Sequence, residues 1–280
     1  MRKILIPVDH STISDNLIAF AAGMNGDFLV EEIILLKTFH IGSVARVLPS
    51  ADMLLMTPNE IQAVQQSAEE RAEQLAELLK SSVSRPVKVR TLVVDGSMEN
   101  ALGDTITNER PDLLMIGNDP ENREPEDVVS GVVIALAKLS TVPVLLVPVK
   151  ARYRKPEKLM IPTSFDNIER LSSFKDLFRS RIWKDAHIHV FHAGSPDAAS
   201  QYEEQIRTVY GHLQGHRIKF HFRECIKHEI SREILNYADE EDHDMIFALP
   251  GKHGFFQQVL HKSVTQDFAL HADRPVMLLK

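Results

Sequence analysis

The sequence predicts an α/β protein with two tandem domains, each a doubly wound parallel β-sheet, at residues 1–150 and 151–280. Two features predict this fold: an internal repeat, and short apolar runs that alternate with segments of helical periodicity. Apolar runs without alternating polar residues are typical of strands buried on both faces, as in a parallel sheet covered by helices. Right-handed crossover connections between such strands give a doubly wound sheet.

The internal repeat consists of three apolar segments that recur in the same order. They pair 3–7 with 158–162, 111–117 with 243–249, and 142–148 with 274–280. The first pair is offset by 155 residues and the other two by 132, so the second copy is 23 residues shorter between its first and fourth strands. Chance similarity would not preserve this order, and we infer a duplication.

In the first half, five apolar runs predict strands and four amphipathic stretches predict helices. The strands are expected at 3–8, 32–39, 86–93, 112–117 and 143–148, and the helices near 12–23, 59–81, 97–108 and 127–140. The segment 59–81 is the clearest helix, because its apolar residues form one stripe and its glutamates lie largely outside it. Residues 40–58 are expected to be a loop folded onto its own domain, with a lid or contact surface as the alternative.

The second half repeats this plan. Its strands are expected at 157–162, 186–192, 217–223, 244–249 and 275–279, with helices between them. The segment 150–156 is a short basic connector and marks the boundary between the two domains.

Charge and cysteine content restrict the function. The net charge of −7 divides into −8 for residues 1–150 and +1 for residues 151–280, and neither half is basic enough to predict a nucleic-acid interface. No apolar stretch is long enough to span a bilayer, and the opening segment is typical of a first strand rather than of a signal peptide. A single cysteine, Cys225, excludes an internal disulfide and a multi-thiolate zinc site. We therefore expect a cytoplasmic protein with no membrane or nucleic-acid partner.

Three motifs follow one another in the first half. They are Ile-Leu-Ile-Pro-Val-Asp at 4–9, Pro-Asp-Leu-Leu-Met-Ile-Gly at 111–117, and Val-Pro-Val-Leu-Leu-Val at 142–147. The second half has a similar ending, at 260–264 and 274–279. In this order and repetition the chain resembles the universal stress protein family, as a tandem-domain member, over nearly its whole length.

This resemblance implies a fold, an assembly and a ligand. The implied fold is a five-stranded parallel sheet in each half, of the adenine nucleotide alpha hydrolase-like type with strand order 3-2-1-4-5. The implied assembly is an intramolecular pseudo-dimer of the two halves, with a homodimer as a further option. Many members bind ATP: an acidic residue ending strand one reads adenine, and a Gly-x2-Gly-x9-Gly-Ser/Thr run cradles the phosphates through backbone N–H groups.

The first half matches this nucleotide motif only in part. Asp9 holds the acidic position and Gly117 the first glycine, but the second glycine is Pro120, which has no N–H to donate. Ser130 and Gly131 stand where Gly and Ser/Thr are needed, in the inverted order. The loop between them is acidic and would repel a triphosphate. We therefore expect no tight ATP binding, and expect Asp9 to cap the next helix or to bond a nearby loop.

The second half departs from the motif differently. Ser164 replaces the acid that ends strand one, which weakens adenine recognition. The loop after strand four is basic, and Lys252, His253, Lys262 and Ser263 are candidates to hold a phosphate or another small anion. The alternative is a tight turn with solvated lysines.

No metal site or catalytic motif is predicted. His187 and His189 share one face of a predicted strand, and His221 lies on the neighbouring strand, so a three-histidine metal site is conceivable. The favoured interpretation is that these imidazoles pack on helices or carry hydrogen bonds. The patterns of P-loop, nucleophile-elbow, zinc-protease and dinucleotide sites do not occur. We therefore predict a non-enzymatic stress-response protein that has no cofactor. It is expected to bind a protein partner or a small anionic ligand. The alternatives are an ATP- or AMP-binding sensor and, last, a weak nucleotide hydrolase.

Overall fold

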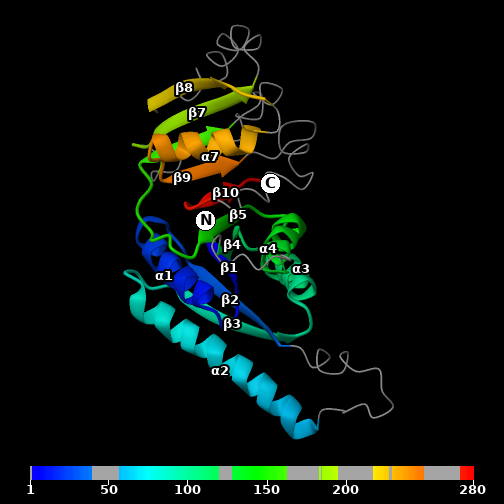
Figure 1. Ribbon diagram of the computed structural model, residues 1–280. Coiled ribbons are helices and arrows are strands. Elements are labelled where there is room, and N and C mark those ends of the chain that lie inside the picture. The colour runs from blue at the N-terminus through cyan, green and yellow to red at the C-terminus, as the bar shows by residue number, and fades with distance from the viewer. Residues whose placement is uncertain are drawn as a thin grey trace, which may run out of the picture. The chain divides into compact units, whose positions relative to one another are not determined.

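Buried apolar runs form parallel strands in both halves of the chain, as the absence of polar alternation predicted (Figure 1). The computed structural model describes residues 2–39, 57–119, 128–162, 183, 185–194, 217–226, 229–248 and 272–280. The chain divides into two compact units, Met1–Gly117 with Ala135–Val144, and Asn118–Ile134 with Leu145–Lys280. The domain boundary placed at residue 150 from the repeat stays a prediction.

The strands of the first half adopt the expected order. They are β1 (Lys3–Val8), β2 (Glu32–Phe39), β3 (Lys88–Asp95), β4 (Leu113–Asn118) and β5 (Val144–Pro148), arranged β3-β2-β1-β4-β5. β1 pairs in parallel with both β2 and β4, which makes it the central strand from which the chain winds in both directions. The predicted order 3-2-1-4-5 is confirmed.

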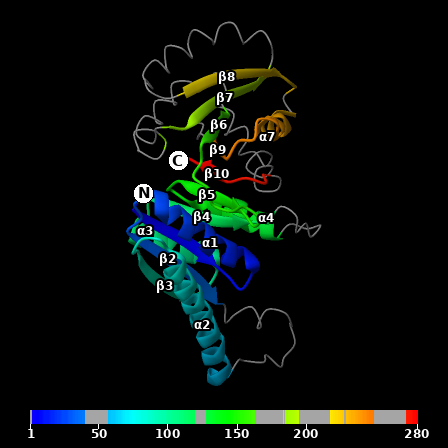
Figure 2. The same cartoon turned by 90° about the vertical axis from the view of Figure 1, so that its left-hand side faces the viewer.

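Helices cover both faces of this sheet. They are α1 (Thr12–Asp27), α2 (Pro58–Ser82), α3 (Met98–Glu109) and α4 (Val128–Leu139). Figure 1 shows α1 and α2 on one side of the strands and α3 on the other, and α1 and α2 face the viewer in Figure 2. This is the doubly wound arrangement that the sequence predicted.

Helix α2 begins at Pro58 for a local reason. The Thr57 hydroxyl accepts a hydrogen bond from the Glu60 backbone N–H (3.3 Å), and the Glu60 carboxylate accepts one from the Thr57 N–H (2.7 Å). This reciprocal pair satisfies two donors that a helix start leaves open, and a proline at the first helical position has no N–H to satisfy. The predicted helix 59–81 is confirmed, whereas most of the predicted loop at 40–58 lies outside the described residues.

The second half repeats the arrangement. Its strands are β6 (Lys158–Pro162), β7 (His187–Gly194), β8 (Arg217–Glu224), β9 (Met245–Ala248) and β10 (Val276–Leu278), in the order β10-β9-β6-β7-β8. Counted within this half, the order is again 3-2-1-4-5. Helix α7 (Ile230–Glu240) precedes β9 as α3 precedes β4.

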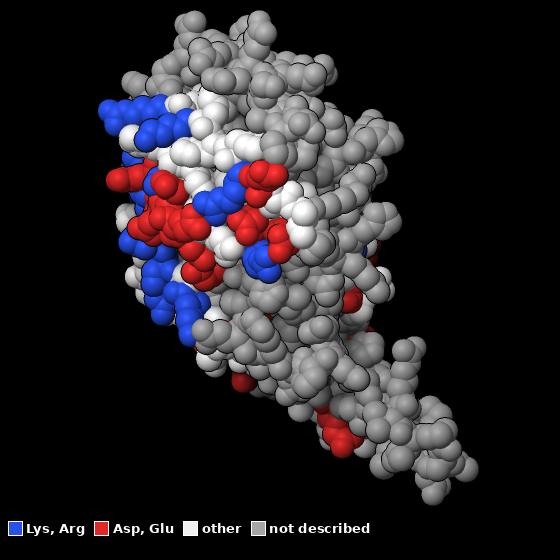
Figure 3. All heavy atoms as spheres, turned by 45° about the horizontal axis from the view of Figure 1, so that its top comes forward, with Lys and Arg blue, Asp and Glu red and all other residues white. Residues whose placement is uncertain are grey.

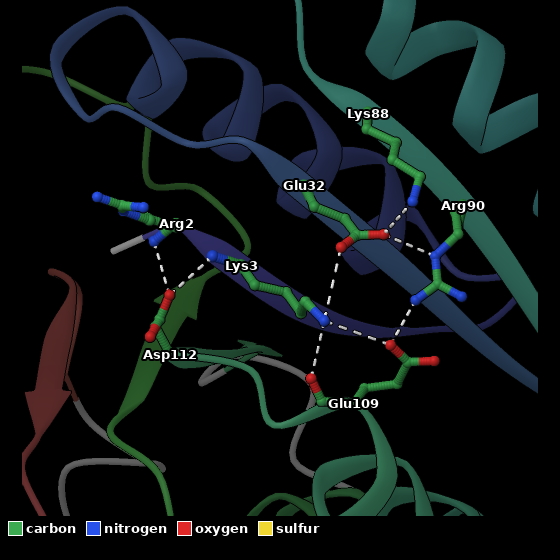
Figure 4. Close-up of polar contacts among 7 residues, drawn as sticks. All are labelled: Arg2, Lys3, Glu32, Lys88, Arg90, Glu109 and Asp112. Atoms are coloured by element: carbon green, nitrogen blue, oxygen red, sulfur yellow. Dashed lines mark hydrogen bonds and ion pairs between the residues drawn. The ribbon is translucent and has the colours of Figure 1, made fainter.

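A cluster of charged residues holds the amino ends of β1 and β4 together (Figure 4). The Lys3 ammonium donates to the backbone carbonyl of Glu109 (2.8 Å) and lies 3.4 Å from its carboxylate. Asp112 accepts hydrogen bonds from the backbone N–H groups of Arg2 (2.7 Å) and Lys3 (2.9 Å). We call Lys3, Glu109 and Asp112 the amino-edge clamp, because together they tie the end of α3 and the start of β4 to the start of β1.

The second half contains the same clamp at the residues that the repeat predicts. The Lys158 ammonium donates to the Glu241 carbonyl and lies 3.0 Å from its carboxylate. Asp244 accepts hydrogen bonds from the backbone N–H groups of Glu157 and Lys158, each at 2.8 Å. The offsets from Lys3, Glu109 and Asp112 are 155, 132 and 132 residues, the same as those of the apolar segments. The clamp therefore adds equivalent contacts in space to the sequence evidence for the duplication.

Candidate functional site

The carboxyl edge of the first-half sheet is where a doubly wound fold places a ligand. Asp9 follows the last residue of β1, and Gly117 is the last residue but one of β4. Both residues contact α1, the helix that follows β1, through Ser14 in the case of Asp9 and through Ile13 and Leu17 in the case of Gly117.

The Asp9 carboxylate stabilises the start of α1. One oxygen, Oδ1, accepts hydrogen bonds from the backbone N–H of Ser11 (2.8 Å), the Ser11 hydroxyl (2.5 Å) and the Ser14 hydroxyl (2.7 Å). The backbone N–H of Asp9 in turn donates to the Ser14 hydroxyl (2.8 Å). These bonds use the carboxylate to order the turn that leads into the helix. Of the two roles expected of Asp9, the bonds are those of a residue that orders the turn before α1, since Ser11 is the N-cap residue and, among the described residues, no side chain caps this helix.

Two cationic side chains complete the surroundings of Asp9. Lys37 of β2 is 8% exposed and donates to the backbone carbonyl of Thr38 (3.0 Å). Arg71 of α2 donates to the backbone carbonyl of Asp9 (3.4 Å) and to the Asp15 carboxylate (2.8 Å). Sequence reasoning missed both residues, although Lys37 is a charged residue inside an apolar strand run, which is a usable signal.

The pKa values of Asp9 and Lys37 reflect this arrangement. Partial removal from water raises the pKa of Asp9, but hydrogen bonds from Ser11 and Ser14 and the charge of Lys37 outweigh it, so the pKa lies below its ordinary value. Burial lowers the pKa of Lys37, and the charge of Asp9 only partly opposes this. The corner thus holds an ionised carboxylate, whose Oδ1 accepts three hydrogen bonds, beside a desolvated amine.

Gly117 is required by packing against α1. A Cβ atom at this position would lie 2.1 Å from Cγ2 of Ile13 and 3.1 Å from Cδ1 of Leu17, far inside van der Waals contact. A glycine here lets the end of strand β4 approach helix α1 closely. Its place in the nucleotide motif therefore coincides with a steric need of the fold.

Among the predicted site residues, the structure describes the surroundings of Asp9 and Gly117. Ser130 and Gly131 lie within α4, and the Ser130 side chain is outside the described part of the chain. The residues of the basic second-half loop are also outside it: Lys252, His253, Lys262 and Ser263. Their assignment to an anion site stays a prediction.

Histidines of the second half come together, but not in the predicted combination. His189 of β7 stacks on His221 of β8 with ring centroids 4.8 Å apart, and the ring of His243 meets His189 edge-on at 4.7 Å. Tyr237 of α7 contacts all three rings. His187 instead lies 3.0 Å from an Arg217 nitrogen. Among the described residues, no group of three or more His, Cys, Asp or Glu side chains is placed to hold a metal ion.

The chain was compared with known families and structures. The model of the universal stress protein family matches residues 1–148 and 181–280. A universal stress protein from Archaeoglobus fulgidus DSM 4304 has a similar structure, with a TM-score of 0.67 and 16% identity over 99% of this chain and 96% of that one. A functionally unknown protein from Pseudomonas aeruginosa PAO1 is also similar, with a TM-score of 0.57 and 13% identity over 100% and 92%. At such identities the similarity shows the fold alone.

The remaining comparisons are negative. No match was found among curated proteins. Within the part of the chain that the structure describes, no helix has both the length and the apolar character that crossing a bilayer requires.

Proposed function

Because the chain belongs to the universal stress protein family, we propose that it is a non-enzymatic cytoplasmic stress-response protein whose ATP motif has degenerated in both halves. It acts by binding a protein partner or a small ligand. The observation that supports this best is that Asp9 and Gly117, the motif residues retained in the first half, are both committed to α1.

The commitment of Asp9 weakens adenine recognition. Oδ1 already accepts three hydrogen bonds from Ser11 and Ser14, whereas Oδ2 accepts none from the described residues. A ligand that used both carboxylate oxygens would displace bonds to Oδ1, and hydrogen bonds to a charged group contribute roughly 1.5–3 kcal/mol each. Asp9 therefore offers a base one open oxygen rather than two.

The phosphate side of the motif is weakened by its sequence. Pro120 offers no backbone N–H, and the segment between β4 and α4 carries a strong excess of negative charge. Its charged residues are Asp119, Glu121, Arg123, Glu124, Glu126 and Asp127. Magnesium would offset part of the repulsion with a triphosphate, but it would not restore the missing N–H donor.

Nucleotide binding by the full-length chain tests this proposal. We expect no adenine nucleotide in the supernatant of the denatured protein, no change in melting temperature with about 1 mM MgATP, and no release of phosphate from ATP. The matched variant Pro120→Gly/Ser130→Gly/Gly131→Ser restores the glycine and serine positions of the motif, and should bind MgATP more tightly than the natural chain. Co-purified ATP or AMP, or a melting-temperature increase of several degrees, would instead support the sensor alternative, and phosphate release would support the hydrolase.

A further inference from the structure

Three histidines and a tyrosine fill the layer between α7 and the strands β7 and β8. His189 is 3% exposed and His243 is 2% exposed, and both contact Tyr237, which also stacks on Phe191 (4.3 Å between ring centroids). His221 is half-buried against the same tyrosine. We call His189, His221, His243 and Tyr237 the histidine cluster.

The first half has no titratable side chain at the matching positions. In the strand registers, Lys3 pairs with Glu32 as Lys158 pairs with His187, which places Ile34 where the second half has His189. The same registers place Leu92 at the position of His221. The 132-residue offset places Thr105 and Pro111 at the positions of Tyr237 and His243. The cluster is therefore specific to the second half and is not a requirement of the fold.

The hydrogen bonds of the histidine cluster suit neutral rings. Tyr237 and His189 are joined by a hydrogen bond between the hydroxyl and Nδ1 (3.3 Å), and Nδ1 of His243 donates to the carbonyl of Ala238 (3.4 Å). Nε2 of His221 and Nε2 of His243 are buried without a hydrogen-bond partner among the described residues. A proton added at either nitrogen would have no acceptor, and two charged rings would lie less than 5 Å apart.

Charged groups face the cluster from every element packed on it, but they are already paired with one another. The carboxylates of α7 and the following turn pair as Glu241 with Lys158, Glu233 and Glu240 with Arg223, and Asp239 with Arg274. Lys219 of β8 adds a further positive charge. Figure 3 shows acidic and basic groups interspersed over the described surface of this part of the molecule. The charge of Glu241 favours a proton on His189 and on His221, but burial outweighs it at both rings.

We propose that the histidine cluster is a proton-responsive switch: weak acid charges the cluster, loosens the packing of α7 on β7 and β8, and leaves the first half folded. This proposal is independent of whether either half binds a nucleotide. It assigns the second half a sensing role that its apolar counterpart in the first half cannot perform.

The pKa values set the direction of the response. Burial, reinforced by the neighbouring His221, lowers the pKa of His189 from 6.5 to about 4, and burial beside His189 lowers that of His243 to about 4. Burial also lowers the pKa of His221, although the charge of Glu241 opposes it. Between pH 6.5 and about 4 the unfolded chain thus binds more protons than the folded chain. Stability from the cluster is therefore complete above pH 6.5 and is lost as the pH falls through this window.

Trp183 allows the second half to be followed in the full-length chain. It is the single tryptophan of the sequence, it is 1% exposed, and its ring contacts Phe247 of β9 edge-on at 5.4 Å. Urea unfolding monitored by its fluorescence should show a lower midpoint at pH 5.0 than at pH 7.5. In His189→Ile/His221→Leu, which carries the first-half residues, the drop in midpoint should shrink by more than half, whereas His187→Gln, on the same strand but outside the cluster, should keep it.

An equal drop in the double variant and the natural chain, or no drop in the natural chain, would overturn the proposal. If the double variant does not fold, His189→Asn/His221→Gln keeps polar groups that do not titrate and should give the same reduction. Histidine titration by NMR in the natural chain is a readout that needs no variant. Ring signals of His189 and His243 that titrate near pH 6.5 would contradict the switch, and signals that titrate near pH 4 would support it.

Discussion

The two edges of the sheets have changed to different extents since the duplication. At the amino edge, Lys3 and Lys158 make the same two kinds of bond. The ammonium group donates to a backbone carbonyl, and the backbone N–H donates to an aspartate. At the carboxyl edge, Asp9 of the first half corresponds to Ser164 of the second. A contact that holds the sheet together occurs in both halves, whereas the edge where this fold places ligands differs between them. The comparison separates residues that the fold needs from residues that a function needs.

Even the amino edge differs in what surrounds the clamp. In the first half, Glu32 lies 2.7 Å from Arg90, 3.1 Å from Lys88 and 3.6 Å from Lys3, so one carboxylate serves three cations (Figure 4). In the second half, His187 takes the place of Glu32. The clamp itself does not depend on this network, because Lys158 keeps its bonds without it.

The largest loss of stability is expected at Gly117, a residue of the carboxyl edge that the fold itself needs. It lies at the carboxyl edge but has a structural task, so Gly117→Ala should lower the free energy of unfolding by about 1–3 kcal/mol through overpacking against Ile13. Gly103→Ala is the matched control, because a Cβ atom there meets nothing within 4 Å. In the interior of α3 that change should stabilise the protein by about 0.5–1 kcal/mol. Denaturant unfolding measures both, and a neutral Gly117→Ala would show that the glycine is not needed for packing.

A smaller effect is expected at the two clamp aspartates. Asp112→Ala and Asp244→Ala each remove an acceptor of two backbone N–H groups at solvent-accessible positions, and each should cost about 1 kcal/mol. Because the bonds are the same, the two losses should agree within about 0.5 kcal/mol. Urea unfolding followed by circular dichroism for both halves, and by Trp183 fluorescence for the second, provides the measurement. A large cost in one half only would show that the clamp has lost its role in the other.

The fold could be predicted from the sequence because its signals are local. Apolar runs, helical periodicity and the repeat lie along the chain, and the polar residues after Asp9 indicated that its carboxylate can bond the turn before α1. The steric role of Gly117 could not be predicted, since it depends on how closely α1 approaches β4 in space. The histidine cluster was missed for a similar reason: His243 precedes β9, far along the chain from His189, and only strand order and α7 bring them together. Aligning the two halves position by position would have shown three histidines at first-half positions that carry no titratable group.

The smallest effect is expected for Asp9→Asn, which separates a structural role of the carboxylate from a role in ligand binding. Asparagine is as good as aspartate at a helix start, so Asp9→Asn should keep most of the bonds from Ser11 and Ser14 and cost about 0.5 kcal/mol or less. Asp9→Ala removes the acceptor and should cost about 1 kcal/mol. If Asp9 serves only to order the turn before α1, stability should fall only where the side-chain acceptor for Ser11 and Ser14 is lost. MgATP should then leave the melting temperature of all three proteins unchanged. A nucleotide-dependent shift in the natural chain that disappears in Asp9→Asn would mean that the carboxylate reads a ligand, and that the carboxyl edge of the first half has kept a function as well as a structure.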